Sequence, residues 1–149
     1  MGPVSGESFE PLIGGCMCGG VRFRVEEPLL GALYCHCKRC QRRSGSAFSM
    51  TALTAQGSFA VTEGAELVRA YHPEGGWRKS FCTNCGSHTH TTNPEDDSIV
   101  AIRLGCLDGD PGIRPQVHQF TAYAMPYEPL PDDGLPRFPE RLGEGEPEG

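Results

Sequence analysis

The sequence lacks the features that mark several large classes of protein. It has no apolar run near the roughly 20 residues of a membrane-spanning helix, so we expect no transmembrane segment. It has no excess of positive charge, because its formal net charge is −6, whereas nucleic-acid binding needs concentrated Lys and Arg to neutralise phosphates. A repeat of about 20–50 residues, a Gly-rich phosphate loop, a nucleophile elbow and a paired-carboxylate signature are also missing. We therefore expect neither a membrane nor a nucleic-acid partner.

The first fifteen residues lack a basic segment followed by an apolar one, so they do not resemble a secretory signal. Position 6 is Gly, where a myristoylation site needs Ser or Thr. We therefore expect a cytoplasmic protein. In that reducing compartment, clustered cysteines bind metal or carry out chemistry more often than they form disulfides.

Charge is distributed unevenly along the chain. Residues 127–149 hold seven acids and two Arg, a charge of −5, which leaves −1 for residues 1–126 of the total of −6. The C-terminal stretch is also rich in Pro and Gly, a composition typical of irregular chain. The length of 149 residues favours a single domain.

Short alternating or apolar segments predict a mainly β fold. Val21, Phe23 and Val25 alternate with Arg22 and Arg24, which is typical of a half-buried strand. The segment at 98–104 is apolar on both faces, as in a central strand. The one stretch that we expect to be helical is 38–43. Further strands are expected at 47–54, 58–62, 67–71, 77–81 and 117–123.

Seven of the eight cysteines fall into three clusters. The Cys-x-x-Cys-Gly form of the last cluster is typical of a zinc knuckle, in which the turn directs both sulfurs at one point and the Gly lets backbone amides approach them. A Cys-x-Cys pair on extended chain places both side chains on one face, so two sulfurs can bind one metal. The first and last pairs together would give the four ligands of a closed zinc site. The clusters are Cys16-Met17-Cys18, Cys35-His36-Cys37-Lys38-Arg39-Cys40 and Cys82-Thr83-Asn84-Cys85.

The middle cluster differs because it offers three sulfurs and no evident fourth ligand. Cys35 and Cys37 would share a strand face, and Cys40 returns to it after one turn. His36 should point the other way, so we do not count it as a ligand. Three protein ligands and one vacant position are typical of a reactive zinc, whereas four filled positions are typical of a structural one. The surrounding basic residues could attract an anionic ligand; they are Lys38, Arg39, Arg42 and Arg43.

Each of these interpretations has an alternative. The four-cysteine set could instead form redox or disulfide pairs, and the three-cysteine set could be a second structural site closed by a distant His or by Cys106. The basic residues could form a solvated turn. Cys106 fits burial as a small apolar side chain better than ligation. His88 and His90 share a strand face and could be ligands or polar anchors, whereas we interpret the remaining candidates as structural, namely His72, His118, Met17 and Trp77.

Three segments resemble the glutathione-dependent formaldehyde-activating enzyme family, which includes centromere protein V. They are Gly15-Cys-Met-Cys-Gly-Gly-Val-Arg-Phe23, Cys35-His-Cys-Lys-Arg-Cys-Gln-Arg-Arg-Ser-Gly-Ser-Ala-Phe48 and Phe81-Cys-Thr-Asn-Cys-Gly-Ser87. The segments at 107–111 and 132–138 also fit, so the resemblance runs from about residue 14 to 139.

The resemblance implies a β-tent fold of short, coiled antiparallel sheets held by zinc. It implies two zinc ions, one structural and one catalytic. It also implies that residues 127–139 lie ordered across the domain; Tyr127 departs mildly from the family, which often has Trp there. We accordingly expect an N-terminal extension at 1–13, a zinc domain at 14–139 and an acidic flexible tail at 140–149. The structural ligands would be Cys16, Cys18, Cys82 and Cys85, and the catalytic ligands Cys35, Cys37 and Cys40.

The family's reaction joins glutathione to formaldehyde and gives S-hydroxymethylglutathione. The resemblance therefore implies a zinc-dependent, carbon–sulfur lyase-type enzyme whose partners are a small thiol and a small aldehyde. The basic residues near the middle cluster could hold the carboxylates of glutathione. The alternative is a non-catalytic, zinc-stabilised binding module of the same family.

Overall fold

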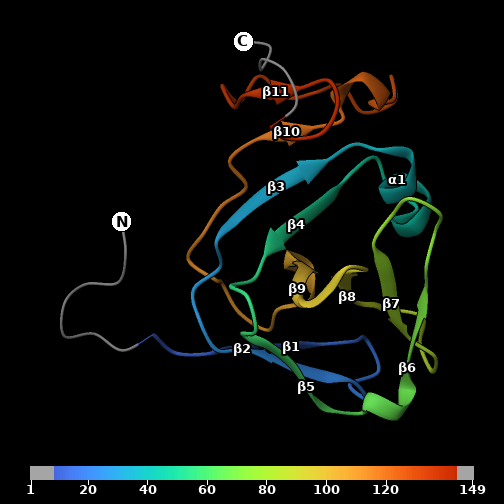
Figure 1. Cartoon of the computed structure of the whole chain (residues 1–149). Helices are drawn as coiled ribbons and strands as arrows, with labels where there is room; N and C mark the ends of the chain where they lie inside the picture. The colour runs from blue at the N-terminus through green and yellow to red at the C-terminus, as the bar shows by residue number, and fades with distance from the viewer. Residues whose placement is uncertain (1–8, 144–149) are drawn as a thin grey trace. The chain divides into compact units, whose positions relative to one another are not determined.

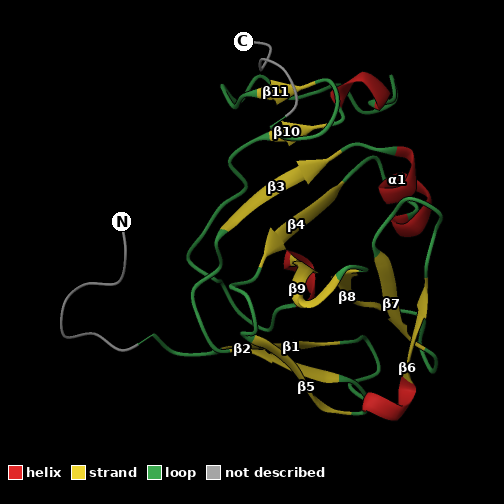
Figure 2. Cartoon of the chain, viewed as in Figure 1, coloured by secondary structure: helices red, strands yellow, loops and turns green. Residues whose placement is uncertain are grey.

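A computed structural model of the chain describes residues 9–143. Short strands make up most of its regular structure, and α1 is the one α-helix of the described residues (Figures 1 and 2). The expectation of a mainly β fold with antiparallel sheets is confirmed. Residues 1–8 of the expected extension and 144–149 of the expected tail lie outside the described residues. The elements are β1 Leu12–Gly15, β2 Arg22–Val25, β3 Gly31–Cys35, α1 Lys38–Ser44, β4 Ser49–Leu53, β5 Phe59–Glu63, η1 Ala65–Leu67, β6 Val68–Tyr71, β7 Arg78–Cys82, β8 His88–Asn93, β9 Asp96–Arg103, η2 Leu104–Cys106, β10 His118–Gln119, η3 Thr121–Tyr123 and β11 Arg137–Phe138.

Contacts divide the chain into two compact units. The first unit comprises Met1–Leu30 and Leu53–Gly112, and the second comprises Gly31–Ala52 and Ile113–Gly149. Each unit is therefore discontinuous in sequence. None of the helices in the described part of the chain has the length and apolar character needed to cross a membrane.

The first unit contains a three-stranded antiparallel sheet, β1-β2-β5, and the antiparallel strands β9-β8-β7-β6. The alternation expected in β2 is present, because Phe23 and Val25 are fully buried while Arg24 is exposed. In β9, Val100, Ala101 and Ile102 are all buried, as expected of a segment that is apolar on both faces.

The second unit contains the strand order β11-β10-β3-β4, with α1 following β3. Here the expectation of antiparallel pairing holds less well, since β10 runs parallel to both β3 and β11. The strand expected at 117–123 is also shorter than predicted and ends at Gln119. The reason is local: Phe120 has φ 58°, a left-handed conformation that cannot continue a strand, and η3 begins at Thr121.

Candidate functional site

Four cysteines of the first unit meet at one point, where the loop after β1 lies beside the turn between β7 and β8. Their sulfur atoms all lie within 4.8 Å of one another. The Sγ atoms of Cys16 and Cys18 are 3.5 Å apart, and those of Cys18 and Cys82 are 3.9 Å apart. Tetrahedral zinc with Zn–S bonds of about 2.3 Å requires sulfur–sulfur distances of about 3.8 Å. The donor set of this cluster therefore fits a four-coordinate metal; its members are Cys16, Cys18, Cys82 and Cys85.

Backbone amides approach these sulfurs, as expected of a knuckle. The N–H of Val21 donates to Cys16 Sγ at 3.2 Å, and the N–H of Gly20 donates to Cys18 Sγ at 3.4 Å. A Cβ at Gly20 would lie 3.3 Å from Cys18 Sγ and 2.8 Å from a methyl carbon of Leu67, so a side chain there would require the Leu67 side chain to shift. Such amides stabilise thiolates, so the turn geometry favours the form of cysteine that binds metal.

Ser87 provides a further contact to this cluster. Its hydroxyl oxygen accepts from the Met17 N–H at 2.9 Å and from the Cys85 thiol at 3.3 Å; when Cys85 is a thiolate, the Ser87 hydroxyl hydrogen donates to it instead. This contact, followed by the N–H of Ser87, lowers the pKa of Cys85 to about 5. Hydrogen bonds from the Asn84 side chain, and then from the Gly20 N–H, lower the pKa of Cys18.

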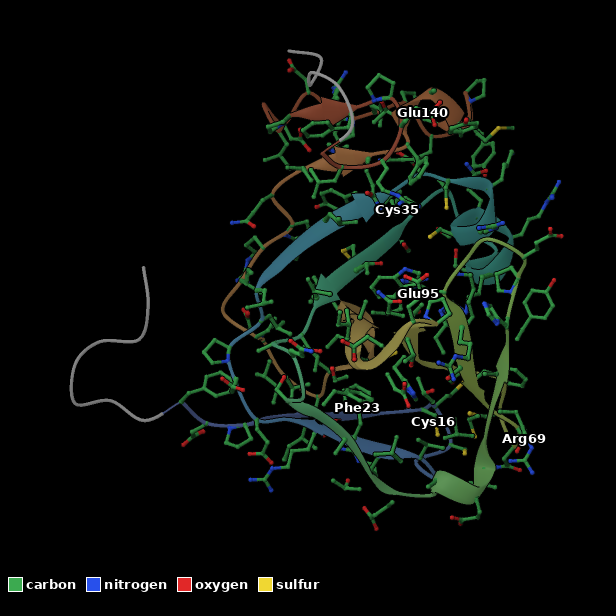
Figure 3. All side chains as sticks on the ribbon, in the orientation of Figure 1. Cys16, Phe23, Cys35, Arg69, Glu95 and Glu140 are labelled. Atoms are coloured by element: carbon green, nitrogen blue, oxygen red, sulfur yellow. The ribbon has the colours of Figure 1, made fainter. Side chains whose placement is uncertain are left out.

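Three cysteines of the second unit form the other cluster, at the junction of β3 and α1. Cys35 is the last residue of β3, Cys37 is the N-cap of α1 and Cys40 lies in the first turn of the helix. Cys37 has an extended backbone conformation and accepts a hydrogen bond from the Cys40 N–H at 3.4 Å, which holds the first turn against it. The three sulfurs lie within 4.8 Å of one another. Cys16 and Cys35 mark the two clusters in Figure 3.

Burial and mutual proximity make the second cluster a suitable cation site. Cys35 and Cys40 are buried, and Cys37 is half-buried. Hydrogen bonding with Cys37 and Cys40, and then burial, raise the pKa of Cys35. Three closely spaced sulfurs in a buried position cannot all be thiolates unless a cation lies among them. Within the described residues of the second unit, no other His, Cys, Asp or Glu joins the three sulfurs.

The basic residues predicted near this cluster all lie on α1. Lys38, Arg39 and Arg42 are exposed, and Arg43 is half-buried. The ammonium group of Lys38 donates to Gln41 Oε1 at 3.1 Å and to the Met125 sulfur at 3.2 Å. Both partners are neutral. Among residues 9–143, no carboxylate contacts Lys38 within hydrogen-bond distance.

Gln41 is a residue that the sequence analysis did not single out. It is buried in α1, and its amide nitrogen donates to the carbonyl oxygens of His36 at 2.8 Å and Tyr123 at 2.9 Å. Gln41 therefore joins the segment that follows β3 to η3, while its oxygen holds Lys38. Only the position of Gln41 on the buried side of a short helix could have suggested this role.

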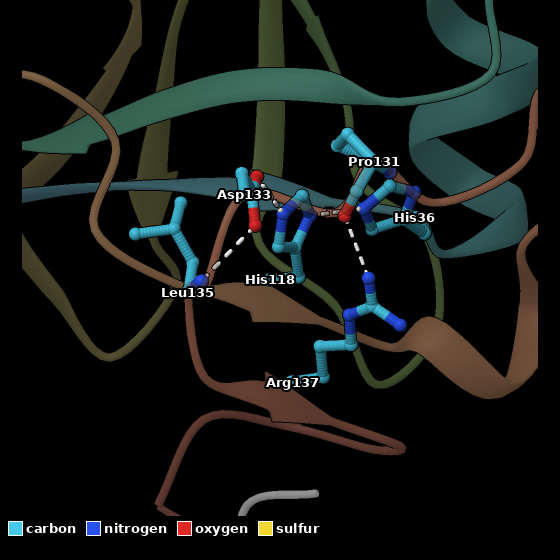
Figure 4. A network of polar contacts seen from close by, with 6 residues as sticks. All are labelled: His36, His118, Pro131, Asp133, Leu135 and Arg137. Carbon is cyan, nitrogen blue, oxygen red and sulfur yellow. Dashed lines mark hydrogen bonds and ion pairs between the residues drawn. The ribbon is translucent and has the colours of Figure 1, made fainter. Parts of the chain in front are cut away.

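His36 does not belong to the group formed by the three sulfurs, and its buried imidazole joins a series of polar contacts (Figure 4). His36 Nε2 and His118 Nδ1 are 2.9 Å apart, and His118 Nε2 lies 2.8 Å from an Asp133 carboxylate oxygen. Burial, and then repulsion from His118, lower the pKa of His36 to about 4. The hydrogen bond from His118 lowers the pKa of Asp133. His118 was expected to be structural, and Asp133 was not singled out.

The remaining candidates lie in the first unit. Cys106 is half-buried and its thiol donates to the carbonyl oxygen of His88 at 3.4 Å. His90 Nδ1 lies 3.0 Å from the Thr89 hydroxyl, and its ring packs against Phe59 with the centroids 4.6 Å apart. Neither histidine belongs to a metal-binding group of the described residues. Of the two interpretations left open for them, the contacts favour polar anchors.

Three comparisons with known proteins bear on this arrangement. A family model described as "Glutathione-dependent formaldehyde-activating enzyme" matches residues 11–123. A curated protein of Halomonas elongata named "Putative glutathione-dependent formaldehyde-activating enzyme" is 29% identical over 105 residues, which cover 66% of this chain and 67% of that protein. A crystal structure of a Rhodobacter sphaeroides protein, a structural genomics target, is similar with a TM-score of 0.54 and 28% sequence identity, covering 66% of this chain and 89% of the other. All seven clustered cysteines fall within the residues matched by the family model.

Proposed function

Because the chain belongs to the glutathione-dependent formaldehyde-activating enzyme family, we propose that it catalyses the reversible addition of a small thiol, glutathione or an equivalent, to a small aldehyde such as formaldehyde. The observation that carries this proposal is the three-sulfur cluster of the second unit, which would give a metal three protein ligands and leave a position for a substrate. The four-sulfur cluster of the first unit offers no such position.

The reaction forms one carbon–sulfur bond. The thiol loses its proton, its sulfur attacks the carbonyl carbon, and the carbon–oxygen π bond opens. The carbonyl oxygen then takes up a proton, so that glutathione and formaldehyde give S-hydroxymethylglutathione with no atom lost. In the opposite direction the same step is a carbon–sulfur lyase reaction.

We assign zinc to both clusters. Cys16, Cys18, Cys82 and Cys85 would hold a structural ion, and Cys35, Cys37 and Cys40 would hold a catalytic ion. Thiolate donors in tetrahedral spacing suit zinc. When bound in the second cluster, zinc would supply a Lewis acid that lowers the pKa of a thiol at the remaining position. The ligand cysteines must stay reduced, so we place the reaction in the cytoplasm.

The chain's own side chains would bind and orient the thiol substrate. Glutathione carries two carboxylates, and four basic residues lie on α1, the helix that contributes Cys40. Lys38 is well placed for this role, because its hydrogen-bond partners among the described residues are neutral and leave its charge available to a carboxylate. Arg39, Arg42 and Arg43 would supply the second anchor. In this assignment the zinc domain spans residues 14–139, between the N-terminal extension and the acidic tail.

Binding and metal content test the proposal together. Protein prepared without added metal should contain two zinc ions, and Cys37→Ser should contain one. Isothermal titration calorimetry should show that glutathione binds and that S-methylglutathione, whose sulfur cannot become a thiolate, binds at least about tenfold more weakly. Equal affinity for the two ligands would exclude sulfur coordination.

Catalysis itself is tested by nuclear magnetic resonance exchange spectroscopy of glutathione with ¹³C-formaldehyde. The protein should accelerate exchange between free formaldehyde and its glutathione adduct over the uncatalysed rate, and Cys37→Ser should not. If glutathione binds but exchange is not accelerated, the chain is the non-catalytic binding module of the alternative hypothesis.

A further inference from the structure

A series of hydrogen bonds joins Asp133 through His118 to His36, the residue between Cys35 and Cys37 in the sequence (Figure 4). His36 is 4% exposed and His118 is 1% exposed, whereas the Asp133 side chain is 28% exposed. Burying two imidazoles that share one hydrogen bond costs free energy unless one of the two facing ring nitrogens donates and the other accepts. The contacts therefore specify these roles.

Asp133 determines which atom donates and which accepts in both hydrogen bonds of this series. A carboxylate only accepts hydrogen bonds, so His118 Nε2 must carry a hydrogen and donate it to Asp133. In neutral His118 this leaves Nδ1 as an acceptor, and His36 Nε2 must then carry the hydrogen that lies between the two rings. The ring of Tyr34 stacks on His118 with centroids 4.7 Å apart and an interplanar angle of 18°, which fixes the plane of the intermediate imidazole.

His36 is the residue between two of the three sulfurs, Cys35 and Cys37. Its N–H donates to the carbonyl oxygen of Gln119 at 3.1 Å, and its own carbonyl oxygen accepts from Gln41 at 2.8 Å. Main chain and side chain of His36 are thus both held. Because adjacent side chains on extended backbone point in opposite directions, holding the imidazole on one side holds the neighbouring sulfurs on the other.

We propose that Asp133 and His118 are positioning residues for the three-cysteine cluster: through the tautomer and orientation of His36, they set the geometry in which Cys35 and Cys37 bind a metal. This inference rests on the part of the proposed function that places a metal in the second cluster, and it does not depend on the reaction.

The experiment compares Asp133→Asn with Asp132→Asn. Both changes replace a carboxylate by an isosteric amide in adjacent residues, but only Asp133 contacts His118. An amide can present its NH₂ group to His118 Nε2, which would reverse the donor and acceptor roles of both rings. Zinc release to a chromophoric chelator is followed for the wild-type protein and both variants, and the phase that Cys37→Ser removes is assigned to the second cluster.

In Asp133→Asn we expect release from the second cluster to be about tenfold faster, the usual effect of losing a residue that orients a metal ligand. Release from the four-cysteine cluster should not change, and Asp132→Asn should match the wild type. Wild-type release rates at both clusters in Asp133→Asn would overturn the inference, as would a lowered melting temperature with unchanged metal release. If instead the wild-type protein contains zinc in the first cluster alone, the second metal site is absent and the proposed function, which depends on that site, is wrong.

A second measurement needs no variant. Long-range ¹H–¹⁵N correlation spectra of the histidine rings distinguish protonated from unprotonated nitrogens in the wild-type protein. We expect hydrogen on Nε2 and none on Nδ1 in His118, and hydrogen on Nε2 in His36. An unprotonated His118 Nε2 would overturn the inference whatever the variants do.

Discussion

Removal of the Gln41 side chain should destabilise the protein far more than removal of a comparable exposed glutamine. Gln41 is 7% exposed, and its amide nitrogen donates two hydrogen bonds to carbonyl oxygens at 2.8 and 2.9 Å. Each such bond contributes about 1 kcal/mol, and truncation also leaves its acceptor unsatisfied. The contact with Lys38 adds only a few tenths of a kcal/mol, because the lysine is exposed. We therefore expect Gln41→Ala to lower the free energy of unfolding by about 2–3 kcal/mol.

Urea denaturation followed by circular dichroism gives the change in free energy, and thermal unfolding should show a drop of about 4–12 °C at roughly 2–4 °C per kcal/mol. Gln56→Ala is the matched control. The Gln56 amide nitrogen also donates two hydrogen bonds, at 3.1 and 2.9 Å to Asp96 and Ser98, but the residue is exposed. Its loss should cost about 0.5 kcal/mol or less.

Gln41→Met separates hydrogen bonding from packing, since it keeps the length and volume of the side chain and removes its donors. It should be nearly as destabilising as Gln41→Ala. If Gln41→Met equals the wild type, or if Gln41→Ala costs no more than Gln56→Ala, then the buried amide does not hold the segment after β3 to η3.

Three further outcomes are expected. Cys82→Ser should give an unfolded or insoluble protein if this fully buried cysteine holds the proposed structural zinc, because binding of that ion would contribute directly to folding. A folded, soluble variant that retains two zinc ions would contradict this. Gly64→Ala should lower the free energy of unfolding by at least about 1–2 kcal/mol in urea denaturation. Gly64 has φ +76°, and a Cβ there would lie 1.9 Å from the carbonyl oxygen of Gly20. An unchanged free energy of unfolding would show that the loop adapts to the added methyl group. His118 lowers the pKa of Asp133 in the folded state, so the stabilisation from this pair should be complete above the unfolded-state pKa of about 4 and be lost as the pH falls through the folded-state pKa. The difference in unfolding free energy between the wild type and Asp133→Asn should therefore shrink on acidification. A difference that grows on acidification would contradict this prediction.

The strands and the two cysteine clusters could be predicted because their signals are local. Phe23 and Val25 alternate with charged residues within one short segment, and the pairing of β2 with both of its neighbours buries them. The knuckle at Cys82 and Cys85 needs only a four-residue turn and a following glycine, Gly86, which adopts φ +79°. Such patterns specify the local geometry before any distant segment is in place.

The parts that were not predicted depend on residues far apart in the sequence. Gln41 contacts the Tyr123 carbonyl across 82 positions, and His36 contacts His118 across the same separation. Neither partner carries a motif, because one is a backbone carbonyl and the other a single histidine in a two-residue strand. The left-handed Phe120 was missed for a related reason. Val117, Thr121 and Tyr123 favour a strand around it, but Phe120 adopts positive φ and its N–H donates to the distant carbonyl oxygen of Glu140 at 2.8 Å.

The two clusters differ in how the chain completes them, and this difference supports the proposed assignment of one closed and one open metal site. In the first, two turns supply four sulfurs and backbone N–H groups reach them from the same turns. In the second, the residue between the first two cysteines is a histidine, a side chain that is itself a common metal ligand. Alternation along the chain directs it away from the sulfurs, and its Nε2 is engaged by His118, which is engaged in turn by Asp133. The hydrogen-bonded chain therefore keeps the imidazole from becoming a fourth protein ligand, and a cation held by Cys35, Cys37 and Cys40 would retain a position for an external thiol.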